Sequence, residues 1–240
     1  MAIERASLTG LILAGGRSSR MQGPARAQAA DVPADAGHVR DARHARGAPS
    51  GIPAGEGVVD KGLLLLNGHT LAYHAWRFLA PQVERVLVSA NRCQDRYARY
   101  GRVIADDPAL GADLGPLAGI EAALRAMATP WLLVMPVDVC AVPTDLGARL
   151  AETVESAGAL AAYACTRGAG DERKVHPLCM LAHASLAGGL RQYLLGGGRK
   201  VQRWHQRIGA AAVVFGGGDQ AFFNVNTPED LVQASQYCKS

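Results

Sequence analysis

Short, continuous apolar runs recur along this 240-residue chain, and segments whose apolar residues follow helical spacing lie between them. The run from Trp131 to Met135 is typical of a central parallel strand that is buried on both faces. The segment after it places Leu146, Leu150 and Val154 on one side of a helix. Because parallel strands need long crossovers, this alternation predicts an α/β fold: a three-layer, doubly wound, mostly parallel sheet with helices on both faces.

The same patterns predict the other elements, and a chain of this length can bury a sizeable core within one domain. We expect a single domain over 1–240. Its other strands are predicted at 11–14, 85–90, 102–105, 159–165, 211–215 and 222–225. Its other helices are predicted at 70–79, from 115 onward, at 186–195 and from 227 onward, with a polar loop over 166–174.

The first predicted strand runs directly into the pair Gly15 and Gly16. Glycine permits positive φ and close approach of another molecule, so such a turn presents bare backbone N–H groups. Arg17 and Arg20 follow, and with Lys61 they would form a positive cradle suited to a polyphosphate. An ordinary strand-to-helix connection uses the same glycines, so this alternative stays open.

Polar side chains follow three other predicted strands: Asn91, Asp106 and Asp138. Ligands bind at the carboxyl edge of open parallel sheets, so Asn91 and Asp106 are candidates for base or ribose contacts. A single carboxylate such as Asp138, with substrate phosphates supplying further oxygens, suits Mg²⁺. Asn and Asp also begin turns, which is the alternative for Asn91 and Asp106. Asp138 could cap the helix that starts near Thr144, although Thr144 itself can serve that purpose.

For two further polar residues, the sequence allows either a structural or a functional role. His176 precedes an apolar stretch, where a lone histidine is more often structural than catalytic. Arg199 follows the glycines at 196–198 and offers positive charge near a second substrate, or is simply solvated.

Residues 24–57 differ in composition from the rest of the chain, because Ala, Gly and Pro dominate them. Such a segment buries too little apolar area to offset its ordering entropy, so we expect a flexible surface insertion. Its position beside the glycine turn keeps a lid over the phosphate site as the alternative.

Several motifs occur together in a fixed order. They are Leu13-Ala14-Gly15-Gly16, Arg20-Met21, Asp60-Lys61, Asn91, Val103 to Asp106, Gly115 to Ile120, Pro136 to Asp138, His176-Pro177 and Phe223 to Leu231. This set resembles the signature of nucleotidyltransferases with a nucleotide-diphospho-sugar transferase fold, most closely the molybdenum cofactor guanylyltransferases. One departure is large: the family passes almost directly from Met21 to Asp60, whereas residues 22–59 intervene here.

The resemblance implies transfer of GMP from GTP to the terminal phosphate of molybdenum-molybdopterin, with Mg²⁺ as cofactor and pyrophosphate leaving. It implies molybdoenzymes or their chaperones as further partners. The implied catalytic residues are Arg17, Arg20, Lys61 and Asp138, with Asp138 as the metal ligand. The implied nucleotide-binding residues are Leu13, Ala14, Gly15, Lys61, Asn91, Asp106 and Asp138. Candidate second-substrate residues are His176, Arg199, Asn224 and Asn226.

Two other functions remain open from the residues. A cytidylyltransferase or sugar-phosphate nucleotidyltransferase shares the glycine turn and the lysine, although an Asn at 226 favours the guanylyl enzyme by resemblance. A non-catalytic nucleotide-binding protein would result if the insertion held Lys61 away from the phosphates. A dehydrogenase or a P-loop NTPase is disfavoured, since neither glycine motif is present.

Charge and cysteine content exclude several classes of protein. The formal net charge is only +4, and no Lys/Arg run with interleaved aromatics appears, so nucleic acid is an unexpected partner. The five cysteines are odd in number and contain no Cys-x-x-Cys pair, which favours a reducing cytoplasm over a disulfide framework. The apolar run near the N-terminus is too short for a membrane span and is a poor signal peptide.

Overall fold

The computed structural model describes residues 3–14, 60–168 and 172–237. Gly15, Arg17, Arg20 and the insertion expected at 24–57 lie outside the described residues. What the sequence predicts for them therefore stays a prediction.

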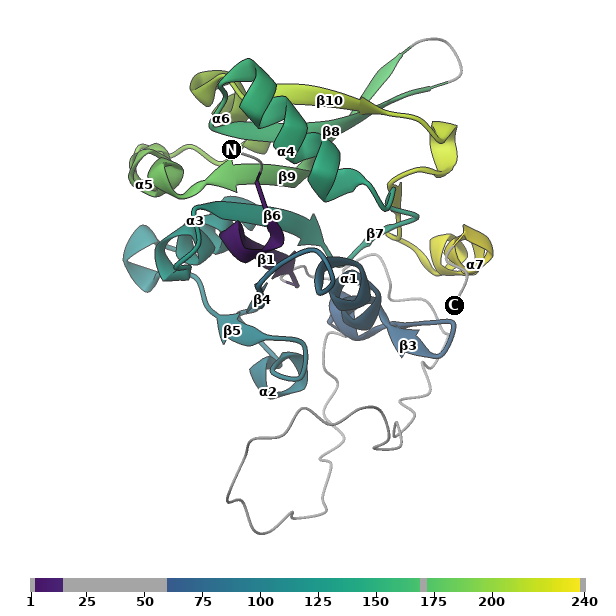
Figure 1. Ribbon diagram of the computed structural model, residues 1–240. Helices are drawn as coiled ribbons and strands as arrows, with labels where there is room; N and C mark the ends of the chain where they lie inside the picture. The colour runs from purple at the N-terminus through teal and green to yellow at the C-terminus, as the bar shows by residue number, and fades with distance from the viewer. Residues whose placement is uncertain (1–2, 15–59, 169–171, 238–240) are drawn as a thin grey trace.

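A seven-stranded sheet forms the centre of the described molecule (Figure 1). The strand order is β10-β8-β9-β6-β1-β4-β5, and every neighbouring pair is parallel except the two that β9 makes. The strands are β1 (Leu8–Leu13), β4 (Arg85–Ser89), β5 (Arg102–Ile104), β6 (Trp131–Pro136), β8 (Ala161–Arg167), β9 (Arg173–His183) and β10 (Ala211–Phe215). The predicted mostly parallel sheet is confirmed.

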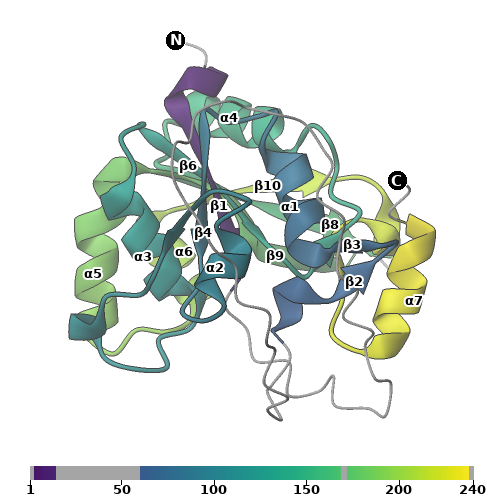
Figure 2. The same ribbon diagram turned by 90° about the horizontal axis from the view of Figure 1, so that it is seen from below.

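Helices cover both faces of this sheet, as the view from below shows (Figure 2). One face carries α1 (Leu71–Leu79) and α4 (Leu146–Ala157). The other carries α3 (Pro116–Ala126), α5 (Ala187–Leu195) and α6 (Val201–Ile208). The three-layer arrangement follows from strands that are apolar on both sides and must be covered twice.

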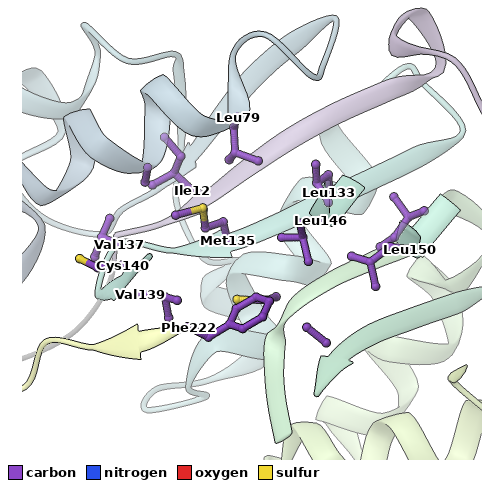
Figure 3. Packing of buried hydrophobic residues seen from close by; sticks show 14 of the residues in the cluster. Ile12, Leu79, Leu133, Met135, Val137, Val139, Cys140, Leu146, Leu150 and Phe222 are labelled. Carbon is purple, nitrogen blue, oxygen red and sulfur yellow. The ribbon is translucent and has the colours of Figure 1, made fainter. Parts of the chain in front are cut away.

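Each face of the sheet has its own apolar core. On the first face, Ile12 and Met135 of the sheet pack with Leu79 of α1 and Leu146 of α4 (Figure 3), and all four are at most 3% exposed. On the second face, Leu117 and Ile120 of α3 are fully buried in a separate cluster. The helical spacing of the apolar residues therefore matches the faces that are buried.

Short elements connect the main ones. The two-residue strands β7 (Val139–Cys140) and β11 (Phe223–Asn224) pair antiparallel, and so do β2 (Leu65–Leu66) and β3 (His69–Thr70). Two more helices are α2 (Gln94–Tyr97) and α7 (Pro228–Tyr237), and α7 contacts β2. Short 3₁₀ helices are η1 (Arg5–Ser7), η2 (Lys61–Leu63), η3 (Pro108–Leu110), η4 (Ala184–Leu186) and η5 (Gly218–Gln220).

The structure corrects the sequence-based assignment in one region. The segment expected as a loop over 166–174 is strand at both ends, because β8 continues to Arg167 and β9 begins at Arg173, while residues 169–171 lie outside the described residues. Arg173 and Lys174 are exposed there, so the apolar pattern that normally marks a strand is missing. The pairing also shifts register between Tyr163 and Ala164, opposite the segment that contains Pro177. Proline lacks an N–H donor and is tolerated at such an irregularity.

In the described ranges, none of the helices has the length and apolar character needed to cross a membrane.

Candidate active site

Four neighbouring parallel strands, β6, β1, β4 and β5, end at the same edge of the sheet. A residue expected in the site follows each of them closely: Asp138, Ala14, Asn91 and Asp106, respectively. Parallel strands with a common direction force this grouping, and the carboxyl edge is where such folds bind ligands.

The Lys61 ammonium lies in a polar cluster at this edge. Its Nζ donates hydrogen bonds to Asp138 Oδ2 at 2.7 Å and to Asn226 Oδ1 at 2.8 Å. The Lys61 side chain is 11% exposed and that of Asp138 is 27% exposed, so the ion pair is partly shielded from water. Attraction between two charges is stronger in such a place than at an open surface.

Local structure fixes both partners of Lys61. The Val225 N–H donates to the Asp138 carbonyl at 2.8 Å, which attaches the C-terminal segment to the end of β6. The Asp230 carboxylate accepts the N–H groups of Asn226 and Thr227 at 2.7 and 2.9 Å. The Asp230 N–H donates in return to Thr227 Oγ1 at 3.2 Å. This reciprocal cap starts α7 and holds Asn226 in place.

Asn91 and Asp106 contact each other across β4 and β5. Asn91 Nδ2 donates to Asp106 Oδ2 at 2.8 Å, and the Asp106 N–H donates to Asn91 Oδ1 at 2.9 Å. Both side chains therefore have a fixed direction, and both face the same cavity. The two sequence candidates for nucleoside contacts form one unit.

This cavity has a volume of about 380 Å³, within the range of roughly 300–1,000 Å³ that is usual for small-molecule sites. Its wall consists of Leu13, Ala14, Asp60, Ser89, Ala90, Asn91, Arg92, Asp106, Asp113, Leu114, Gly115, Pro116 and Gly119. The segment at 115–116 opens α3, so the N-terminus of that helix borders the cavity. Such a terminus favours negative charge.

Leu13 and Ala14, two of the implied nucleotide-binding residues, line the cavity, but part of their backbone already has partners. The Ala14 N–H donates to the Ser89 carbonyl at 3.0 Å, and the Leu13 carbonyl accepts the Val137 N–H at 3.2 Å. These two groups hold the sheet together at its edge.

His176 is a buried residue of β9 and is only 5% exposed. Its ring stacks on Phe222 with 4.5 Å between centroids, and its Nε2 lies 3.0 Å from Thr166 Oγ1. Burial, with a smaller contribution from Lys174, lowers the pKa of His176 to about 4, so the ring is neutral at pH 7. These contacts match the structural alternative for a lone histidine.

Arg199 takes a role that its sequence context did not predict. Its Nη1 donates to the carbonyls of Leu194 and Gly198 at 2.8 and 2.7 Å. It thereby satisfies a carbonyl at the C-terminus of α5, where a cation also interacts favourably with the helix dipole. Asn224 lies half-buried in β11, opposite Val139, one residue beyond Asp138.

Asp60 and Arg92 are among the residues of the cavity wall that received no role from the sequence. Their only signal was their position, directly before Lys61 and directly after Asn91. The bond from Lys61 to Asn226 was also missed, because it joins positions 165 residues apart.

The oxygen donors at Lys61 are also the kind that Mg²⁺ prefers. Asp138 and Asn226 present a carboxylate and an amide oxygen to a single cation, the Lys61 ammonium. Within residues 3–14, 60–168 and 172–237, no group of three or more His, Cys, Asp or Glu side chains could hold a metal ion by itself. A metal here would need oxygens from a substrate, as the sequence-based hypothesis assumed.

Comparison with known proteins identifies relatives over nearly the whole chain. The model of the MobA-like NTP transferase domain matches residues 54–208. A molybdenum cofactor guanylyltransferase of Ralstonia nicotianae is 38% identical over 238 residues, which cover 98% of each chain. A protein of the same name from Burkholderia orbicola is 37% identical over 231 residues, 94% of each chain.

Solved structures share the fold. The molybdopterin-guanine dinucleotide biosynthesis protein A of Archaeoglobus fulgidus superposes with a TM-score of 0.64 at 20% identity, covering 96% of this chain and 98% of that one. A Bacillus anthracis protein described as a glucose-1-phosphate thymidylyltransferase gives 0.66 at 12% identity, with 96% and 94% coverage.

Proposed function

Because this chain belongs to the molybdenum cofactor guanylyltransferase family, we propose that it transfers GMP from GTP to the terminal phosphate of molybdenum-bound molybdopterin. The products are molybdopterin guanine dinucleotide and pyrophosphate. One observation supports this most directly. The Lys61 ammonium is held by Asp138 and Asn226 at the carboxyl edge of the sheet, and at the same edge the Asn91–Asp106 pair lines a cavity that Asp60, the neighbour of Lys61, also lines.

The reaction needs no covalent enzyme intermediate and no strong base. A phosphate oxygen of the acceptor, already anionic, forms the new bond to the α-phosphorus of GTP. The bond from that phosphorus to the bridging oxygen breaks, and pyrophosphate leaves with the electron pair. The protein therefore has to align the two phosphates and to stabilise the charge that builds up on the leaving group.

Lys61 is suited to this second task. An ammonium has three N–H donors, and Asp138 and Asn226 accept from two of them. A phosphate oxygen can take the third. The paired carboxylate and amide fix the direction of the lysine side chain, so the cation is in place before the charge develops.

Asp138 is the residue we propose as the Mg²⁺ ligand, with the triphosphate supplying the other oxygens. When bound there, the metal would orient the triphosphate and offset charge on the departing pyrophosphate. Asp138 would then share its carboxylate between Lys61 and the metal.

The Asn91–Asp106 pair is our proposed contact for the nucleoside, because each side chain holds the other in a fixed position in the cavity wall. Asn224, beside Asp138 on the β7–β11 ladder, remains our candidate for the acceptor.

Turnover of the purified protein tests this function. Mg²⁺, each of the four NTPs and molybdopterin are supplied, and pyrophosphate release is measured. We expect pyrophosphate release with GTP and molybdopterin, and none with the other three NTPs. Release with CTP would favour the cytidylyltransferase alternative, and GTP binding without release would favour a non-catalytic nucleotide-binding protein.

A further inference from the structure

Asp60 is a buried carboxylate directly before Lys61. Its partners are Arg92 and Tyr97, which lie close together in the chain, and the backbone of Gly62. Asp60 is 6% exposed. Its Oδ1 accepts hydrogen bonds from the Tyr97 hydroxyl at 2.5 Å and from the Gly62 N–H at 3.3 Å. Its Oδ2 lies 3.7 Å from Arg92 Nη2. A charge so removed from water is tolerated only with such partners, so the position of Asp60 depends on them.

Tyr97 supplies the shortest of these contacts. The residue is fully buried at the end of α2. Burial, followed by the hydrogen bond to Asp60, raises the pKa of Tyr97 above its usual value. The hydroxyl therefore stays protonated and acts as the donor to the carboxylate.

Tyr97 also contacts the residue on the other side of Lys61. A Cβ atom added to Gly62 would lie 2.5 Å from Tyr97 Oη, closer than real Cβ contacts allow. The phenol thus rests against the bare backbone of Gly62 while it holds Asp60. Lys61 lies between two residues that the same side chain fixes.

Tyr97 is also close in the chain to the residues that line the nucleoside side of the cavity. Tyr97 belongs to the short helix that follows Asn91 and Arg92. We infer that Tyr97 is a positioning residue, whose hydroxyl acts through Asp60 to direct the Lys61 ammonium relative to the Asn91–Asp106 pair. The effect on turnover rests on the proposed function.

The variant that tests this is Tyr97→Phe, which keeps the ring against Gly62 and removes only the hydroxyl. Tyr100→Phe is the matched control, because it also removes one phenolic hydrogen bond, 2.7 Å long, to Thr70 Oγ1. Melting temperatures of both variants are measured first, so that any loss of folded protein is corrected.

The first readout is the rate at which Lys61 is acylated by a small amine reagent, followed by peptide mass spectrometry. This rate does not depend on any enzymatic activity. Lys61 is 11% exposed and ion-paired, so we expect slow labelling in the wild type. Tyr97→Phe should raise it several-fold, while the exposed Lys174 of the same molecule labels at its usual rate and Tyr100→Phe changes neither.

The second readout is GTP turnover in the wild type, Tyr97→Phe, Lys61→Ala and the double variant. We expect Tyr97→Phe to lower kcat about tenfold in the wild-type background, because small misplacements of a catalytic group are costly. The KM for the acceptor should not change. In the Lys61→Ala background the same change should have little further effect, since its target is gone.

The outcomes separate the inference from the proposed function. Unchanged Lys61 labelling in Tyr97→Phe overturns the inference, and so does an equal loss of kcat in both backgrounds. If the wild type turns over no NTP, the proposed function fails and the labelling rate alone decides the role of Tyr97.

Discussion

Two clusters of charged side chains in this molecule differ in how many charges they bring together and in what they leave for a ligand. The lysine cluster contains one ammonium, one carboxylate and one amide: Lys61, Asp138 and Asn226. The arginine cluster contains two carboxylates and two guanidiniums: Asp107, Glu121, Arg125 and Arg191. Both clusters are neutral, but the first has one cation with a free N–H donor and one partly exposed carboxylate, whereas in the second each carboxylate lies against two guanidiniums.

The geometry of the arginine cluster is that of a structural connection. Arg191 Nη1 donates to Asp107 Oδ2 at 2.8 Å and to Glu121 Oε1 at 3.0 Å, and Arg125 Nη1 donates to Asp107 at 3.1 Å. The Ala109 N–H, together with Arg191, lowers the pKa of Asp107, so this carboxyl stays ionised. The cluster joins the turn after β5 to α3 and α5.

Asp106 and Asp107 are adjacent residues of the same type with different partners. Asp106 faces Asn91 and the cavity, whereas Asp107 turns toward the helices and accepts from arginines. We therefore expect substitutions in the lysine cluster to reduce turnover and substitutions in the arginine cluster to reduce stability.

The largest expected effect is that of Lys61→Ala. It should lower GTP turnover by about a hundredfold or more, because it removes a fixed cation from a site where charge builds up. The melting temperature should change little, since Asp138 remains partly exposed to water. Pyrophosphate release and thermal unfolding measure the two quantities. Turnover equal to that of the wild type would remove Lys61 from the site.

Arg191→Met should have the opposite profile. Glu121 is fully buried, its Oε2 has no hydrogen-bond partner, and its remaining cation Arg125 lies 3.6 Å away. We expect the melting temperature to fall by roughly 5 °C or more, because the buried Glu121 carboxylate loses its hydrogen-bonded cation and keeps only the more distant Arg125, with turnover per folded molecule retained.

The control for this variant is Arg77→Met on the exposed side of α1, which should leave the melting temperature unchanged. A loss of turnover in Arg191→Met without a loss of stability would show that the arginine cluster is functional after all.

The smallest expected effect concerns a titration outside both clusters. His205 is 3% exposed and stacks on Tyr163, and burial lowers its pKa to about 4 from 6.5. Below pH 6.5 the unfolded chain binds a proton that the folded chain does not, so this stability is present above pH 6.5 and is lost as pH falls toward 4.

His205→Phe keeps the stacked ring and removes the titration. Its free energy of unfolding should therefore fall less than that of the wild type between pH 7 and pH 5, by about 1–2 kcal/mol. Urea unfolding at both values measures this difference. His176 titrates in the same direction, so some acid sensitivity should remain in the variant. Identical pH dependence in the two proteins would contradict a neutral buried His205.

The sequence predicted those site positions that depend on the local pattern of apolar and polar residues. Asn91, Asp106 and Asp138 follow buried strands, and parallel strands bring such positions to one edge. It could not predict that Asn226 contacts Lys61, since that depends on the two-residue ladder between β7 and β11. Tyr97 carried no signal either, because a buried tyrosine in a four-residue helix looks like any other core residue.

The prediction from the sequence was wrong where a strand has a polar composition. Arg173 and Lys174 lie in β9 but point to solvent beyond the core, so their segment was expected to be a loop. Arg199 was a candidate near a second substrate, with a solvated side chain as the alternative, and in the structure its Nη1 donates to two carbonyls at the end of α5. A positive side chain after a helix serves the helix terminus as readily as a ligand.

We propose that the lysine cluster binds the triphosphate and its metal. Asp138→Asn tests it most directly, because the amide keeps the size of the side chain and removes the charge on which Mg²⁺ coordination depends. Melting temperature and Mg²⁺-dependent GTP turnover are measured on one preparation. We expect turnover to fall by about a hundredfold, with partial rescue at high Mg²⁺ and little change in melting temperature. A destabilised variant with full turnover would contradict the claim and make Asp138 a structural turn residue.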